Sequence, residues 1–387
     1  MKAGRMTLGL ALLLAGLLLT LGGCAPAQEK EPLVIGAIFS ITGDQSYLGE
    51  PERNTLQMLA DEINKGGGIK GRPIRLVIYD DEGDPTKARL AATKLIQQDK
   101  AVAIIGPSLT PTSMAVIEVT QKAQVPLISC AAGVVITEPA PERRWVFKTA
   151  QTDRLAAARI YQYLQSQGIT RVAILTVTTS FGESGRRELE ALAAQYGITI
   201  VAKEVFGEKD TDMIPQLTNI KMTPAQAVIC WGTGKAPAQV AKNMKQLDFK
   251  IPLVQSHGAA SKRFIEAAGD AAQGIILPAG KLTIYRTLPD SDPQKAVCQS
   301  YDQKYQARFK TPASSFGGYA YDAMRMLVMA LEKSGPDREK LRAELEGIRN
   351  YVGISGVFNM SPEDHNGLSP EAFVMVIIDK GEFALIK

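Results

Sequence analysis

Short hydrophobic runs alternate with longer amphipathic segments from Leu33 onward. This alternation is typical of βαβ units, in which helices connect the strands of a parallel sheet. The runs are hydrophobic at every position rather than at every second one, as expected for strands that helices cover on both faces. We predict strands at residues 33–39, 74–79, 102–105 and 125–128, with helices at 86–98 and 112–122.

The same pattern begins again after residues 145–148. Because the second half repeats the rhythm of the first, the predicted fold class is α/β, with two Rossmann-like lobes that each contain a central parallel sheet. In this half we predict helices at 152–167, 181–195, 211–219 and 235–246, and strands at 172–177, 198–205, 227–231 and 252–254.

The C-terminal region departs from this rhythm. Three predicted helices, at 292–309, 313–333 and 337–348, precede short antiparallel strands at 357–360, 373–378 and 383–386. Because a region with both kinds of structure can complete both lobes, we expect the chain to cross between them near residues 149, 281 and 356. The predicted domains are an N-lobe of residues 33–148 and 282–356, and a C-lobe of residues 149–281 and 357–387.

A capping residue followed by proline marks three predicted helix starts, at Asp84-Pro85, Thr110-Pro111 and Thr311-Pro312. An N-cap side chain accepts hydrogen bonds from the first free N–H groups of a helix, and proline suits the first turn because it has no N–H to leave unpaired. Ser180 and Glu183 have the spacing of a capping box at a fourth start.

The N-terminus has the three parts of a secretory signal peptide. Lys2 and Arg5 precede a hydrophobic run at 6–21, and Gly22-Gly23-Cys24 supplies small residues for cleavage. A retained transmembrane helix is the alternative, but the run falls short of the ~20 residues that a span needs. We predict a signal peptide at 1–23 and a polar tether at 24–32.

Charge and composition narrow the possible functions. The net charge of +4 includes two signal residues, and no basic stripe favours nucleic acid. With two histidines and no Cys/His cluster, neither a metal site nor a cofactor is expected. Cys130, Cys230 and Cys298 are interpreted as free thiols, with a Cys130–Cys230 bridge as the alternative.

An enzyme is the main alternative from another functional class. The run Gly232-Thr233-Gly234-Lys235 could be proposed as a phosphate loop, but it lacks the third glycine of a Rossmann fingerprint. No Gly-x-Ser-x-Gly motif presents a nucleophile either. We therefore expect no catalysis.

Polar segments follow the predicted strands at the edge where open α/β sheets bind ligands. They contain glycine, hydroxyl and aromatic residues and few ionisable groups, which suits hydrogen bonding to a small molecule. The segments are 40–49, 106–112, 130–134, 178–181, 232–234 and 256–259.

Several stretches together resemble the leucine/isoleucine/valine-binding receptors, a family of the type I periplasmic binding fold, over nearly all of residues 33–387. They are ADEINKGGGIKG at 60–71, YDDEGDP at 79–85, IGPS at 105–108, VPLIS at 125–129 and GYAYDA at 318–323. The resemblance implies two lobes joined by a multi-strand hinge, which close on a small-molecule solute and deliver it to ABC permease and ATPase subunits. A sensory receptor with a signalling partner would have the same fold.

The resemblance also implies ligand contacts in the N-lobe. The hydroxyl of Thr110, with backbone groups at Ser108, Ala131 and Gly133, is expected to hold a ligand carboxylate, helped by the dipole of a helix that Thr110 caps. Gly133 stands where the family has a second hydroxyl, so part of that anchor is missing.

The other family positions differ more. His257 stands where the family has the carboxylate that faces a ligand ammonium, so we expect a carboxylate-bearing solute that need not be an α-amino acid: a branched-chain amino acid, or a related aromatic or aliphatic acid or amide. Glu183 or Asp153 could replace the missing acid, and Trp231 could line the site or belong to the core. The remaining expected contacts are Tyr47, Leu48, Phe181, Gly234 and Tyr321.

Residues Leu21-Gly22-Gly23-Cys24 resemble a bacterial lipobox, which implies a lipid anchor on Cys24. If Cys24 carries the lipid, Cys24→Ala releases the protein from membranes and blocks normal signal cleavage, because both depend on that thiol. Solute affinity stays unchanged. Fractionation of cells that express each form checks this, and wild-type protein found wholly in the soluble fraction would contradict the anchor.

Overall fold

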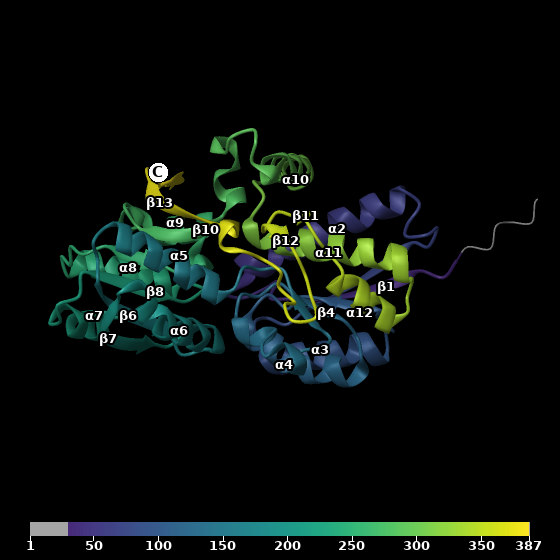
Figure 1. Cartoon of the computed structure of the whole chain (residues 1–387), viewed down its shortest axis with the longest axis horizontal. Helices are drawn as coiled ribbons and strands as arrows, with labels where there is room; N and C mark the ends of the chain where they lie inside the picture. Colours follow the sequence, from purple (N-terminus) through teal and green to yellow (C-terminus); the bar gives the residue numbers. More distant parts are fainter. Residues whose placement is uncertain (1–29, 387) are drawn as a thin grey trace, which may run out of the picture.

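The computed structural model describes residues 30–386 and contains two α/β lobes side by side (Figure 1). The signal peptide, Cys24 and most of the tether lie outside the described residues. The N-lobe sheet is parallel and has the order β2-β1-β3-β4-β5. Its strands are β1 (Leu33–Phe39), β2 (Ile74–Asp80), β3 (Ala103–Ile105), β4 (Leu127–Ser129) and β5 (Val146–Lys148).

The C-lobe sheet has the order β14-β13-β10-β9-β8-β6-β7. Its parallel part is extended at one edge by two antiparallel strands from the C-terminal region. The strands are β6 (Arg171–Val177), β7 (Thr199–Phe206), β8 (Ala227–Trp231), β9 (Leu253–Gln255), β10 (Ile276–Gly280), β13 (Phe373–Asp379) and β14 (Glu382–Leu385). The predicted α/β class with two lobes is confirmed.

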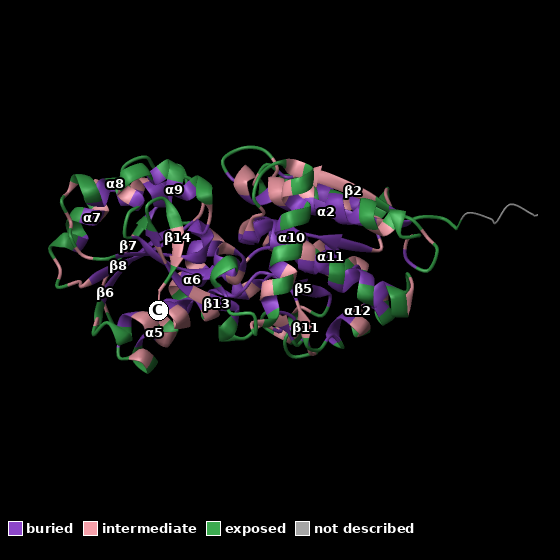
Figure 2. Cartoon of the chain, turned by 90° about the horizontal axis from the view of Figure 1, so that it is seen from above, coloured by how far each residue is buried: buried purple, intermediate pink, exposed green. Residues whose placement is uncertain are grey.

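Helices cover both faces of each sheet, which explains why the strands are hydrophobic at every position. In β1, Ile35 and Ala37 belong to the core shared with α2 (Ser46–Lys65) and α11 (Ser315–Ser334), whereas Ile38 packs toward α3 (Pro85–Gln97) and α4 (Thr110–Ala123). The buried sheets therefore lie inside a shell of exposed helix faces (Figure 2). The C-lobe helices are α5 (Asp153–Ser166), α6 (Ser180–Ala193), α7 (Ile214–Lys221), α8 (Ala236–Gln246) and α9 (Lys262–Ala268).

The C-terminal region contributes to both lobes. Helix α11 packs along α2, and α10 (Pro293–Phe309) and α12 (Arg338–Glu346) flank it. A small sheet of β11 (Tyr351–Val352) and β12 (Val357–Phe358) follows. The lobe boundaries remain predictions. After β12, Met360 still packs in the N-lobe core, and the chain joins the C-lobe sheet at β13.

Only one of the predicted caps is confirmed. The Asp84 carboxylate accepts from the N–H of Thr86 at 2.7 Å and of Lys87 at 3.0 Å. Thr110 is itself helical and follows Leu109 as N-cap, so its predicted capping role was wrong by one residue.

The other two predicted starts also shift along the chain. Helix α11 begins at Ser315 behind the N-cap Ser314, three residues beyond the proline of the predicted start. Ser180 lies inside α6 and makes no capping bond, because Thr179 is the N-cap. In both cases the local spacing was right for a cap, but the backbone enters the helix elsewhere.

The three cysteines that the structure describes are unpaired and buried, which confirms the free-thiol interpretation. No helix within residues 30–386 is long and apolar enough to cross a membrane.

Candidate functional site

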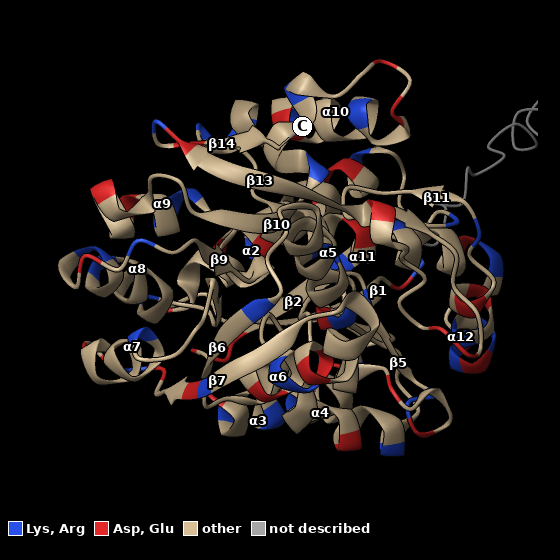
Figure 3. Cartoon of the chain, turned by 60° about the vertical axis from the view of Figure 1, so that its left-hand side comes forward, with Lys and Arg blue, Asp and Glu red and all other residues tan. Residues whose placement is uncertain are grey.

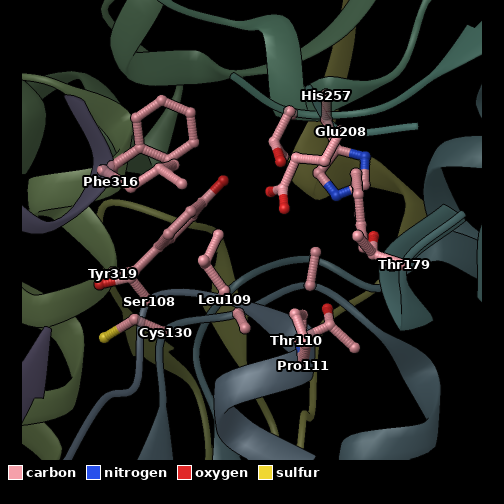
Figure 4. Close-up of a pocket in the computed structure, with 16 residues that line it drawn as sticks. Ser108, Leu109, Thr110, Pro111, Cys130, Thr179, Glu208, His257, Phe316 and Tyr319 are labelled. Carbon is pink, nitrogen blue, oxygen red and sulfur yellow. The ribbon is translucent and has the colours of Figure 1, made fainter. Parts of the chain in front are cut away.

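A cavity lies where the two lobes meet, at the carboxyl ends of the parallel strands (Figure 4). Both lobes supply its wall. Leu48, Ser108 to Pro111, Cys130 to Ala132, Phe316 and Tyr319 come from the N-lobe, and Thr179, Phe181, Glu208, Thr233, His257 and Gly258 from the C-lobe. The wall is mostly apolar with a few polar groups, as in sites for small molecules.

The predicted contact residues are distributed over and around this cavity. Six line it: Leu48, Ser108, Thr110, Ala131, Phe181 and His257. Tyr47, Gly133 and Gly234 lie next to the wall through hydrogen bonds described below. Tyr321 is not among the lining residues and packs against Tyr301, with ring centroids 5.1 Å apart. That any of them touches a solute remains a prediction.

Two of the three predicted backbone positions on the N-lobe wall already bond within the protein. The N–H of Gly133 donates to Thr110 Oγ1 at 3.1 Å, and the N–H of Ala131 donates to Ser129 Oγ at 3.1 Å. Both groups are therefore already used within the protein. Since Thr110 Oγ1 accepts from Gly133, its own proton is left to donate to an acceptor in the cavity.

Gly133 has a packing reason to lack a side chain. A Cβ atom there would lie 2.5 Å from Thr110 Cγ2, which is closer than carbon atoms approach. With Thr110 in this position, residue 133 has no room for the hydroxyl side chain that the family is expected to have there.

The side chain of Ser108 is also engaged. Its hydroxyl accepts from the N–H of Ser40 at 3.1 Å and is hydrogen-bonded to the buried carboxyl of Glu52. Burial raises the pKa of Glu52 well above its usual range, which favours its neutral form. The network holds the loop between β3 and α4 against α2.

On the C-lobe wall, His257 is only 3% exposed and packs among aromatic rings. Its ring lies edge-on to Phe181 and Trp231, with centroids 5.7 and 5.8 Å away. Neither ring nitrogen has a hydrogen-bond partner among the described residues. Burial, and secondarily the charge of Lys148, lowers the pKa of His257 to about 3, so the imidazole is neutral. Trp231 is fully buried and does not line the cavity, in agreement with a core role.

Two buried charged residues lie behind His257. The Lys148 ammonium donates to the carbonyl of Ala132 at 2.5 Å, and Asp153 Oδ1 lies 4.0 Å from His257 Nε2. Burial raises the pKa of Asp153 to about 6 and lowers that of Lys148 to about 7, and each charge opposes the shift of the other. Asp153, one of the two residues suggested as a replacement for the missing acid, thus lies near His257.

Glu208 is a site residue that sequence reasoning missed. It follows β7, and its carboxylate points into the cavity, where it accepts from Gln45 Nε2 at 2.7 Å (Figure 4). The C-lobe wall therefore contains an acid that was not among the predicted contacts. Its place directly after a predicted strand was the signal that could have identified it. Glu183, the other proposed replacement, is bound to Arg186 and Arg187 instead.

Direct contacts join the lobes around the cavity. The Tyr47 hydroxyl accepts from the N–H of Gly234 at 3.0 Å and donates to the carbonyl of Gly258 at 3.2 Å. Ion pairs join Lys235 to Asp44 at 2.6 Å and Arg263 to Glu50 at 3.3 Å. The two lobes therefore touch directly around the cavity.

Charges elsewhere do not indicate another kind of site. Both signs are spread over the outer helices (Figure 3). Within residues 30–386 there is no group of three His, Cys, Asp or Glu side chains that could hold a metal ion.

The neutral state of His257 predicts a pH dependence of stability. Its pKa is about 3 in the folded chain and about 6.5 when unfolded, so the unfolded state binds more protons between these values. The free energy of unfolding therefore falls as the pH drops below 6.5. Between pH 7 and pH 5, wild type should lose about 2 kcal/mol more than His257→Phe. Urea unfolding at both pH values checks this, and equal losses in the two proteins would contradict it.

Comparison with known proteins agrees with this geometry. The family described as periplasmic binding protein matches residues 32–382. The chain is 26% identical over 315 residues to the Leu/Ile/Val-binding protein BraC3 of Rhizobium johnstonii, covering 80% of this chain and 82% of the relative. It is 23% identical to a leucine-, isoleucine-, valine-, threonine- and alanine-binding protein of Pseudomonas aeruginosa, covering 84% of each.

A solved structure has the same fold over its whole length. The crystal structure of an extracellular ligand-binding receptor from Rhodopseudomonas palustris HaA2 superposes with a TM-score of 0.86 at 27% identity, covering 92% of this chain and 100% of that one. The chain therefore belongs to the periplasmic binding protein family, among relatives of the leucine/isoleucine/valine-binding receptors, and is a solute-binding protein rather than an enzyme.

Proposed function

We propose that this protein is the extracytoplasmic, lipid-anchored solute receptor of an ABC importer, and that it closes on a small carboxylate-bearing solute. The observation that carries the proposal is the cavity at the lobe junction, whose wall both lobes supply and which Tyr47 helps to close. A ligand that touches both lobes favours the closed state by its differential affinity. The importer's permease and ATPase subunits are the proposed partners, and the lipid on Cys24 keeps the receptor near them.

The carboxylate is assigned to the N-lobe wall. Thr110 has a proton to donate there, and the N-terminus of α4 favours negative charge. Leu48, Phe181 and Phe316 form the apolar surface that would enclose the body of the solute. Relatives named for binding leucine, isoleucine and valine support a solute of this size, either a branched-chain amino acid or a related acid or amide.

Calorimetric titration of refolded, ligand-stripped protein tests this assignment. The probes are leucine, isoleucine, valine, benzoate and short aliphatic amides. At least one carboxylate should bind, and Thr110→Val should weaken it at least about tenfold, because a hydrogen bond to a charged group contributes about 1.5–3 kcal/mol.

Thr120→Val is the matched control, because Thr120 is buried in the same helix and bonds only to that helix. It should bind like wild type. Equal affinity in Thr110→Val and wild type would show that the carboxylate does not bind at this wall. An amide that binds more tightly than every acid would contradict the proposal that the solute carries a carboxylate.

A further inference from the structure

His257 is an unusual group for a cavity wall. It is almost fully buried, and neither of its nitrogens has a hydrogen-bond partner among the described residues. A buried polar atom without a partner costs free energy, and such atoms are rare in folded proteins. Because this side chain also lines the cavity between the lobes, the missing partner is expected to come from the solute.

We propose that His257 is a hydrogen-bond acceptor, set in one tautomer by Asp153 behind it, which selects solutes that carry an N–H or O–H donor in addition to the carboxylate. The inference rests on the proposed function and narrows its solute class. It assigns a role to a position where the related receptors are expected to have an acid.

Asp153 determines which nitrogen carries the proton. Its Oδ1 lies 4.0 Å from Nε2. Burial raises the pKa of Asp153 to about 6, which still leaves a carboxylate at neutral pH, and the nearby Lys148 and the N-terminus of α5 oppose that rise. A negative charge on this side attracts the N–H to Nε2. The lone pair of the neutral ring is then on Nδ1, which is left to accept from the solute.

A second acceptor lies on the same wall. The Glu208 carboxylate points into the cavity and has one hydrogen bond, from Gln45. The N-lobe wall therefore offers a hydrogen-bond donor, Thr110, and the C-lobe wall offers two acceptors, His257 and Glu208. The cavity matches a solute with a carboxylate at one end and a donor at the other, whether that donor is a charged ammonium or a neutral hydroxyl or amide.

A simple monocarboxylate fits this wall poorly. It would satisfy Thr110 but leave the lone pair of His257 buried without a donor. A site that contains a buried acceptor discriminates strongly against analogues that lack the donor, because its own group then stays unpaired.

Three probes with one carbon skeleton separate these cases: leucine, 2-hydroxy-4-methylpentanoate and 4-methylpentanoate. They share the carboxylate and differ in having an ammonium, a hydroxyl or no donor. Wild type should bind at least one donor-bearing probe more than about tenfold tighter than 4-methylpentanoate. His257→Phe keeps an aromatic ring without an acceptor and should lower this ratio at least about threefold, with Glu208 left to account for the remainder, whereas His257→Gln keeps an acceptor and should retain most of it.

A second measurement needs no solute. The chain has two histidines, so nitrogen NMR of histidine-labelled protein observes His257 beside His365 alone. In wild type we expect His257 to carry its ring proton on Nε2. In Asp153→Asn this preference for Nε2 should be lost. His365 serves as the internal reference, because its nitrogens face the carbonyl of Val146 and the carboxylate of Glu346.

The possible results distinguish the proposed role of His257 from the proposed solute-binding function. An Nδ1–H tautomer, or 4-methylpentanoate binding as tightly as both donor-bearing probes, would overturn this inference and leave the solute-binding function standing. Failure of every carboxylate probe to bind wild type would instead contradict the proposed function, and with it the solute class inferred here.

Discussion

The hydroxyl of Tyr47 joins the two lobes at the edge of the cavity, and the proposed closure of the site rests on this contact. It belongs to the N-lobe, yet both of its hydrogen-bond partners, the N–H of Gly234 and the carbonyl of Gly258, are backbone groups of C-lobe loops. Each of those loops follows a strand of the C-lobe sheet, and Thr233 and Gly258 line the cavity. One side chain thus connects the two loops and holds the C-lobe wall over the N-lobe wall.

The packing of the lobes and the other contacts between them determine how much this one contact can contribute. Each sheet is covered by helices on both faces. One further core cluster also brings Met58 of α2 and Ile354 together with residues of the C-lobe sheet, so the two cores are continuous on that side. The contacts across the cavity that surround Tyr47 are polar, and the two ion pairs among them are exposed. Exposed pairs contribute little. Under the proposed function, a solute that touches both lobes would supply the differential affinity that favours the closed state.

Sequence reasoning was most successful where local pattern and packing agree. The bounds of β1 were predicted to the residue, because an unbroken apolar run between polar segments has one simple explanation in an α/β fold. Asp84 was found as a cap because its two bonds are local. Strand β10 was missed, since Pro278 and Gly280 are unfavourable in a central strand, and only its neighbours on both sides stabilise it there.

The site was harder to predict because its chemistry depends on tertiary partners. Spacing alone does not reveal that Gly133 and Ala131 donate their N–H groups within the protein. Glu208 lies among charged residues of a loop and is exposed even though it lines the cavity, so its position after a strand was the one feature that set it apart from ordinary surface sequence. Tyr321 matched a family position, but on its helix it packs against Tyr301 rather than the cavity.

Small-angle X-ray scattering of wild type and Tyr47→Phe, each with and without a saturating carboxylate that binds, tests the clamp most directly. The account predicts that the solute lowers the radius of gyration of wild type, and that Tyr47→Phe closes less completely at the same occupancy because the two C-lobe loops lose their shared partner. A radius of gyration that stays the same in wild type when the solute is bound would contradict closure of the lobes as the means of binding.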